Sequence, residues 1–469
     1  MFDFNRLGGL SRIDEFGEYH SPNVAYAGGV NVTAQFAGDY TPYLDKKILP
    51  LALRELVVYQ FAEKKTLPKG HGNTWIATRY ARLQIPQAPL SEAVPPVGET
   101  LSIQQVQCVA QQWGDTVTVS DVAQLTIMSD PFQQAIKLMA VQEKETHERN
   151  TFNGLMAIAQ VNYVNSRGSR ASLVAGDVLD TTTVLRTYGA MATLGAPMFN
   201  GPTEPNPQKS AKGNAAGTTS PHLCAVCHTL IVADWSQNST VVLARSYSQV
   251  TRLFNYEIGE WGGIRFTASN MVPTFTGYAL VQGAAVVGGG TFAAANYQTI
   301  ITGSDLNNQY ESYISQVSAA VTVALNGSIS ITTPATTGFT YNIYVGTTAS
   351  PTNLATCAAG PTVGPLAGQA VQLPPGTIVT LTGVGVMQVP PAAPATGVTV
   401  YPTFVFGKDA YAIVTLDNVE HFMLTKADKS DVLNQRSVIG WKAYYGFLIL
   451  NQNFLCRIES VSAFSSTFG

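Results

Sequence analysis

The longest helical pattern in the chain runs from Asp130 to Val164. Asp130 is a good N-cap residue, Pro131 suits the first helical position, and Gln133 completes a pattern like a capping box. A polar run separates two apolar stripes at helical spacing, the first with Phe132, Ile136, Met139 and Ala140 and the second with Phe152, Leu155, Met156 and Ala159. We therefore predict one uninterrupted helix that packs at both ends and has a charged, solvated middle.

The stretch from Lys64 to Glu99 has a different pattern. It contains a turn-rich segment, an alternating strand from Trp75 to Leu83 and four prolines. A structureless loop of this length is uncommon in a compact domain, so we predict a projecting two-stranded arm, with a flexible lid as the alternative. Other periodic segments predict helices at Tyr43 to Ala62, Asp180 to Leu194 and Asp234 to Asn255, and strands at His222 to Asp234, Gly262 to Asn270, Ala443 to Asn451 and Phe454 to Val461.

A nearly charge-free segment with strand periodicity runs from about Gly277 to Gly397. Alternating apolar residues flank Asn326-Gly327, a pair that predicts a tight β-hairpin. Several short strands at this spacing are typical of an immunoglobulin-like or fibronectin-like sandwich. Because the mixed pattern resumes at Tyr401, we interpret this sandwich as an insertion into an α+β chain.

Charged residues make up only 12% of the 469 residues, about half the usual share. Few charges leave little to keep copies apart, which favours a protein whose surface is covered by copies of itself. The net charge of −3 gives no general attraction to nucleic acid or anionic membranes. We find no secretory signal, no membrane-spanning run and no disulfide framework, which indicates the cytoplasm or a particle assembled there.

Two segments resemble chemical motifs. Cys224, Cys227 and His228 have the spacing of a haem attachment site, and two such cysteines also suggest zinc. On a strand Cys224 and Cys227 point to opposite faces, so we expect core cysteines and neither cofactor nor metal. His147-Glu148 is similar to part of a zinc-protease helix, but Thr151 stands where the second histidine is needed, so we expect a solvated helix face.

Arg79 and Arg82 in the predicted arm suggest either a nucleic-acid patch or ion pairs between subunits. Glu92 and Glu99 lie close by in sequence. We favour intersubunit contacts by these four residues.

Four stretches, in this order, resemble the major capsid proteins of tailed double-stranded-DNA bacteriophages, which have the HK97-like fold, and among them the N4-type family. They are Leu90 to Gln105 (LSEAVPPVGETLSIQQ), Gln112 to Gln124 (QWGDTVTVSDVAQ), Glu257 to Phe266 (EIGEWGGIRF) and Tyr401 to Thr415 (YPTFVFGKDAYAIVT). The resemblance covers most of the chain except the inserted sandwich.

The resemblance implies a domain order. It predicts an N-terminal arm with the first helices (1–63), an extended loop (64–105), and a peripheral domain (106–176) that contains the spine helix (130–164). An axial domain (177–277) is followed by the immunoglobulin-like insertion (278–397), the axial return (398–430) and the C-terminal strands (431–469). Some relatives cross-link a loop lysine to a neighbour, but we expect Lys64, Lys65 and Lys69 to stay solvated and charged, so that the shell is locked without covalent bonds.

The implied function is structural: a shell protein without enzymatic activity that forms pentamers and hexamers of a virion head around DNA. The expected partners are further copies of the chain, a portal, a separate scaffolding protein and decoration proteins, with weak, non-specific contact to the DNA and none to membranes. The alternatives are an encapsulin-like compartment, a β-rich adhesin or fibre protein, and a haem or zinc enzyme.

Overall fold

The computed structural model describes the strands β1 (Arg12–Ile13) and β2 (Tyr19–His20), and residues 57–68, 70, 72–81, 83–85, 89, 98–126, 131–199, 221–237, 242–243, 256–279, 281–305, 310–348, 350–362, 366–424 and 435–465. The chain divides into two units, Met1–Leu51 and Ala52–Gly469. In the first unit β1 pairs with β2. Most of the helical segment predicted at Tyr43 to Ala62 lies outside the described residues, and its last turn is the 3-10 helix η3 (Val58–Phe61).

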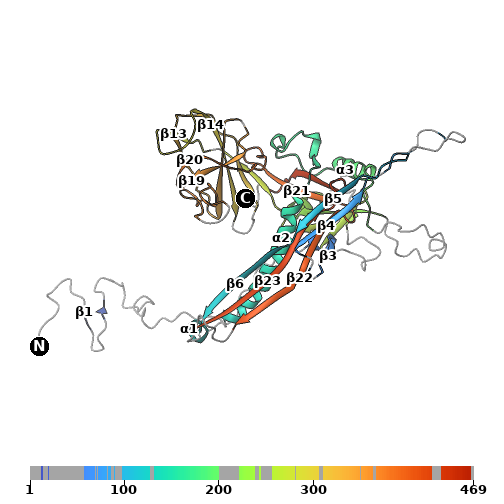
Figure 1. Cartoon of the computed structure of the whole chain (residues 1–469), viewed down its shortest axis with the longest axis horizontal. Helices are drawn as coiled ribbons and strands as arrows, with labels where there is room; N and C mark the ends of the chain where they lie inside the picture. Colours follow the sequence, from blue (N-terminus) through green and yellow to red (C-terminus); the bar gives the residue numbers. More distant parts are fainter. Residues whose placement is uncertain are drawn as a thin grey trace, which may run out of the picture. The chain divides into compact units, whose positions relative to one another are not determined.

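A long helix and a four-stranded sheet form one part of the second unit. Helix α2 (Pro131–Leu155) lies along a sheet of order β3-β22-β23-β6 (Figure 1). Its apolar residues pack against alternate residues of β23, and the cluster contains Ala135, Met139, Ile439, Trp441, Ala443 and Tyr445. The strands of this sheet are β3 (Glu63–Thr66), β6 (Gln111–Ser120), β22 (Tyr411–Leu424) and β23 (Arg436–Ile449), and the short helix α1 (Asp121–Thr126) follows β6.

The predicted length of the long helix is wrong at its C-terminal end, which lies at Leu155 and not at Val164. Gly154, a weak helix former, lies so close to the Phe447 ring that a Cβ atom there would overlap it. Beyond the helix, β7 (Val161–Tyr163) joins a sheet by pairing in parallel with β24 (Leu455–Val461). Strand pairing of this β-branched and aromatic segment therefore replaces the last predicted helical turns.

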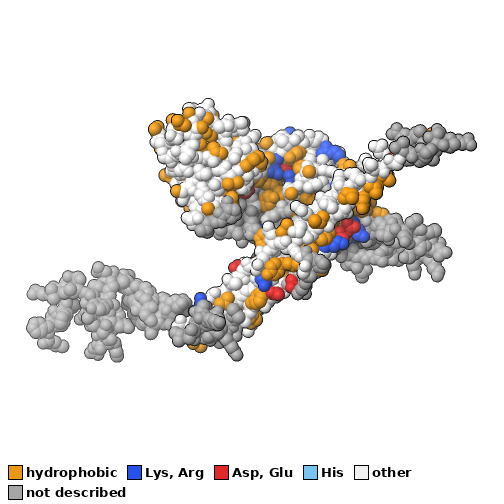
Figure 2. Space-filling view, in the orientation of Figure 1, with side chains coloured by type: hydrophobic (Ala, Val, Ile, Leu, Met, Phe, Trp, Pro, Cys, Tyr) orange, Lys and Arg blue, Asp and Glu red, His pale blue; other side chains and the backbone are white. Residues whose placement is uncertain are grey.

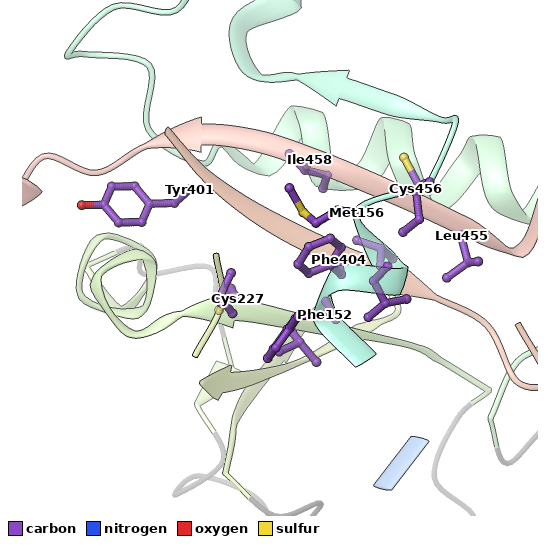
Figure 3. Close-up of a cluster of buried hydrophobic side chains, with 14 of the residues drawn as sticks. Phe152, Met156, Cys227, Tyr401, Phe404, Leu455, Cys456 and Ile458 are labelled. Atoms are coloured by element: carbon purple, nitrogen blue, oxygen red, sulfur yellow. The ribbon is translucent and has the colours of Figure 1, made fainter. Parts of the chain in front are cut away.

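The main core lies around β8 (Leu223–His228), β21 (Thr399–Phe406) and β24, which are paired β8 to β21 and β21 to β24. Figure 3 shows Phe152 and Met156 from the end of α2 beside Phe404 of β21 and Leu455 and Ile458 of β24. Strands β9 (Val242–Leu243), β10 (Glu257–Trp261), β11 (Ile264–Ser269) and β12 (Phe275–Tyr278) extend the same sheet. The predicted helix at Asp180 to Leu194 is confirmed as α3 (Thr181–Thr193), which Asp180 caps.

The predicted boundary between strand and helix near Asp234 is wrong. The strand ends at His228, and helix α5 (Thr229–Ser236) begins directly after it. The Nδ1 atom of His228 accepts a hydrogen bond from the Leu230 amide at 3.2 Å, so the histidine acts as the N-cap. An imidazole in this role is not among the common capping residues, which is why the sequence pattern missed it.

Eight strands between residues 284 and 387 form what we call the β13–β20 module. Pairing runs in the order β13-β17-β20-β19-β18-β14, and β14 pairs further with β15 and β16. These pairings do not separate into two sheets, so the immunoglobulin-like assignment stays a prediction. The strands are β13 (Ala284–Val286), β14 (Ala295–Asp305), β15 (Tyr313–Ser315), β16 (Val321–Val323), β17 (Ser328–Thr332), β18 (Phe339–Gly346), β19 (Asn353–Cys357) and β20 (Ile378–Met387), and they enclose a second buried cluster that includes Ile301, Tyr341 and Leu381.

The hairpin predicted at Asn326-Gly327 is wrong, although the turn itself is present. Asn326 has a φ of 60°, as a left-handed turn residue should. The flanking strands do not pair with each other: β16 pairs with β14, whereas β17 pairs with β13 and β20. β16 and β17 each bury alternate apolar residues, as predicted, but they pair with different strands around the core.

Candidate functional site

An antiparallel two-stranded ribbon is formed by β4 (Thr74–Tyr80) and β5 (Ile103–Val109). The register pairs Tyr80 with Ile103 and Ile76 with Gln107. Directly opposed residues share one face of a ribbon, so this register places four large apolar side chains on the same face. Ile76, Tyr80, Ile103 and Val109 are 53%, 63%, 54% and 48% exposed, and we call their face the outer face.

The opposite face of the ribbon packs on the four-stranded sheet. Cys108 is buried, and its Sγ atom lies 3.5 Å from the carbonyl oxygen of Phe447 on β23. Trp75 packs against the small cluster formed by Leu67, Cys108, Ala110 and Val414. The ribbon is therefore anchored through this opposite face, while the four large apolar side chains of the outer face are turned toward solvent.

The four large apolar side chains of the outer face are not buried in the single chain. A two-stranded ribbon is marginal by itself, and contiguous exposed apolar surface marks a site of association. Figure 2 shows apolar side chains along the ribbon. The outer face is thus the best candidate in the described residues for an assembly surface.

Two of the four predicted contact residues, Arg79 and Glu99, lie in the described part of the chain, and each has a local partner. The Nε atom of Arg79 donates a hydrogen bond to Oε1 of Gln104 at 2.8 Å within the ribbon. Glu99 accepts a hydrogen bond from the Gln84 amide through Oε2 at 3.3 Å. Arg82 and Glu92 lie outside the described residues, so the intersubunit role of all four stays a prediction.

The solvated face predicted at His147-Glu148 is wrong, because Glu148 is buried in the middle of α2. Its carboxylate accepts hydrogen bonds from the amides of Val57 and Val58 through Oε1 and from the amide of Tyr59 through Oε2, the last at 3.1 Å. Burial raises the pKa of Glu148, and the three amide donors partly offset this rise. Glu148 therefore fixes the chain that leads into β3 against the long helix.

His147 lies beside this contact. Its ring stacks on Tyr445 with the ring centroids 3.8 Å apart, and burial lowers its pKa. Sequence reasoning missed both residues because their partners lie far away along the chain: the amides are about 90 positions from Glu148, and Tyr445 is further still. The polar run in the helix is the one available signal, and by itself it predicts an exposed face.

Cys224 and Cys227 occupy core positions, as expected. Both are buried on β8, and Figure 3 shows Cys227 among the core side chains. Burial raises the pKa of Cys227 to about 12 and that of Cys224 further, so both stay protonated thiols. Among the described residues, no group of three or more His, Cys, Asp or Glu side chains is placed to hold a metal.

A buried ion cluster connects the segment after the module to the core. Arg170 donates to Glu459 through two atoms, Nε at 2.8 Å and Nη2 at 2.6 Å, and to the carbonyl oxygen of Ala392 through Nη1 at 2.7 Å. Arg457 lies 3.0 Å from the same carboxylate. The two-point contact with Arg170 satisfies both oxygens of the buried Glu459 carboxylate and gives this cluster a structural role.

The lysines at the base of the ribbon are held locally. Lys65 forms an ion pair with Glu63 at 2.6 Å, and this contact raises its pKa. The Lys64 Nζ atom lies 4.4 Å from the centroid of the Tyr59 ring, and Lys69 lies outside the described residues. The raised pKa of Lys65 agrees with the expectation that it is charged, while the non-covalent locking of a shell stays a prediction.

No family model and no curated protein matches the sequence of this chain. Its fold is similar to that of the capsid of Ralstonia phage GP4, with a TM-score of 0.50 and 9% identity over 94% of this chain and 98% of that chain. The chain has a phage-capsid fold. The capsid of cyanophage Pam1 aligns with a TM-score of 0.48 at 9% identity, covering 93% of this chain and 100% of that chain. A capsid fold with mixed helices and strands fits the predicted HK97-like class.

Within this phage-capsid fold, the outer face of the ribbon is the candidate surface for contacts with other molecules. A search of the described helices for membrane spans finds none that is both long and apolar enough.

Proposed function

We propose that this chain is the major capsid protein of a tailed double-stranded-DNA bacteriophage and belongs to the N4-type family. Copies assemble as pentamers and hexamers into an icosahedral head that encloses the genome. The role is structural and not enzymatic. The chain is assembled in the host cytoplasm and ends in the virion.

The observation that carries this proposal is the outer face of the ribbon. Its four large apolar side chains are exposed in the single chain and have nothing to bury them within the described part of the molecule. A neighbouring copy supplies the missing surface, and repeated contacts of this kind bury more area per subunit than a standard interface. The phage-capsid fold supports the same conclusion, since it is shared with a protein described as a capsid.

The low charge of the chain supports the proposed partners. Only 12% of residues are charged, so copies approach one another with little repulsion. The net charge of −3 favours only weak, non-specific contact with the packaged DNA. A portal, a separate scaffolding protein and decoration proteins complete the particle in this proposal.

Deletion of residues 70–96 tests the proposal because it removes β4 and the segment that follows. We expect subunits that remain folded, as judged by circular dichroism and cooperative unfolding, but form no closed shells in negative-stain electron microscopy. Normal shells from this variant would contradict the assembly role of the ribbon. Wild-type shells that contain a protein cargo and no DNA would instead support the encapsulin-like alternative.

A further inference from the structure

Two neighbouring turns at one end of the β13–β20 module carry exposed apolar side chains. The first turn follows β13 and the second lies between β16 and β17. Val287 in the first is 93% exposed, Leu325 in the second is 69% exposed, and Val286 beside them is 43% exposed. We call these three residues the tip patch, and Figure 2 shows apolar side chains at this end of the module, over β13.

Hydrogen bonds hold the two turns together. The Gly290 amide donates to the carbonyl oxygen of Asn326 at 3.2 Å, and the Asn326 amide donates to that of Phe292 at 2.9 Å. The Ser328 hydroxyl donates to the carbonyl oxygen of Gly288 at 3.0 Å. The apolar side chains are therefore presented on a fixed backbone, which lowers the entropic cost of binding through them.

The strand beside the tip patch lacks the usual protection of a sheet edge. β13 is the last strand in its sheet order and pairs only with β17 among the described strands. Its residues, Ala284 to Val286, are all exposed, and they include no lysine or proline. Natural edge strands commonly use such residues to prevent association, so this edge is suited to a contact.

Charge identifies the kind of partner. Residues 284–387 contain only two charged side chains, Asp305 and Glu311, and no Lys, Arg or His. Glu311 is held inside by Asn342, whose Nδ2 atom donates to Oε1 at 2.6 Å, and burial raises its pKa. Without a cation, the module has no group to attract an acidic protein or an anionic lipid surface. A neutral, apolar surface is the complementary one, and the module of another copy has it.

We propose that the tip patch docks against the module of a second copy of this chain on the assembled shell. This inference rests on the proposed function, because the shell holds copies at fixed spacing and raises their effective concentration to the millimolar range. At that concentration a small patch is sufficient. A self-complementary contact of this kind places the same residues on both sides.

The test uses shells of the full chain that carry Val287→Cys, treated with a short bismaleimide. The five native cysteines are all buried, so the background reaction is low. Thr337→Cys is the matched control, an exposed threonine in the turn after β17, at the end of that strand opposite to the tip patch. We expect a covalent dimer of about twice the 50.0 kDa chain mass from Val287→Cys shells and none from the control. Adding Leu325→Lys should lower the dimer yield at least about tenfold, because it places like charges in the contact.

Three results would overturn this inference. They are no dimer in intact Val287→Cys shells, an equal yield from the Thr337→Cys control, and cross-linking to a different protein, which would show that another partner occupies the patch. Electron microscopy before cross-linking distinguishes a failure of this inference from a failure of the proposed function. If the proposed function is wrong, no shells form at all; if only this inference is wrong, shells form but the expected dimer does not.

Discussion

The core strands β8, β21 and β24 and the ribbon of β4 and β5 use apolar side chains in opposite ways. In the core strands, Val226, Phe404 and Ile458 have no exposed surface. In the ribbon, Ile76, Tyr80 and Ile103 are each more than half exposed. Both groups consist of large β-branched or aromatic side chains, but only the first group is buried within the single chain.

This difference separates two sources of stability. Burial of apolar surface contributes about 25 cal/mol per Å², and the core strands gain it when the chain folds. The outer face of the ribbon gains it only when a second surface covers it. Substitutions in the core should therefore change the free energy of unfolding of the subunit, whereas substitutions on the outer face should change assembly.

The largest effect on the subunit is expected in the core. Phe404→Ala removes a fully buried ring and leaves a cavity, so it should lower the free energy of unfolding by about 3–5 kcal/mol in denaturant titrations. Phe422→Ala, at a 44% exposed position on β22, is the control and should lower it by less than about 1 kcal/mol. Equal losses at the two positions would contradict the distinction between buried and exposed apolar residues.

A smaller effect is expected at the contact between α2 and the chain before β3. Glu148→Ala leaves the amides of Val57, Val58 and Tyr59 without their acceptor, which should lower the free energy of unfolding by about 1–3 kcal/mol. Glu145→Ala on the same helix, at a partly exposed position, should change it by less than about 0.5 kcal/mol. If Glu148→Ala lowers the free energy of unfolding no more than Glu145→Ala does, the contact of Glu148 with the three amides does not stabilise the subunit.

The pH dependence of this contact has a definite sign. Because burial raises the pKa of Glu148 above its ordinary value of about 4.5, the folded state holds its proton more tightly than the unfolded state does. The stability contributed by the carboxyl group is thus complete below about pH 4.5 and is lost as the pH rises through the folded pKa. Glu148→Gln cannot ionise, so the stability of the wild type relative to this variant should fall as the pH rises over that range. A difference that rises with pH would contradict the assigned direction.

Local patterns in the sequence were sufficient for several elements. Asp180 and the apolar spacing after it predicted α3, and continuous apolar residues predicted the buried positions of Cys224 and Cys227. Each of these depends on neighbours along the chain. The order of four stretches further predicted a capsid fold, which the structural match to the GP4 capsid supports.

The predictions are wrong where burial or strand pairing depends on residues that are distant in the sequence. Glu148 is buried because amides about 90 positions away need an acceptor, and Asn326 turns the chain between strands whose partners lie elsewhere. The outer face of the ribbon depends on the register of Tyr80 with Ile103 and on which face rests on β23. The alternation of residues along one strand reveals neither its register with the partner strand nor which of its faces is buried.

The most direct test of the central claim replaces the outer face without changing strand propensity. Ile76→Thr, Tyr80→Thr and Ile103→Thr together keep residues that favour strands but remove the large apolar side chains. The matched control is Val384→Thr with Val386→Thr, two exposed valines of β20. The free energy of unfolding of either variant should stay within about 0.5 kcal/mol per substitution of the wild type.

The measurement is the yield of closed shells, counted by electron microscopy and analytical sedimentation at equal protein concentration. We expect the ribbon variant to give at least about tenfold fewer shells than the wild type, and the control to give the wild-type yield. A ribbon variant that is folded and forms shells at the wild-type yield would contradict the claim that the exposed apolar face of β4 and β5 holds neighbouring copies together.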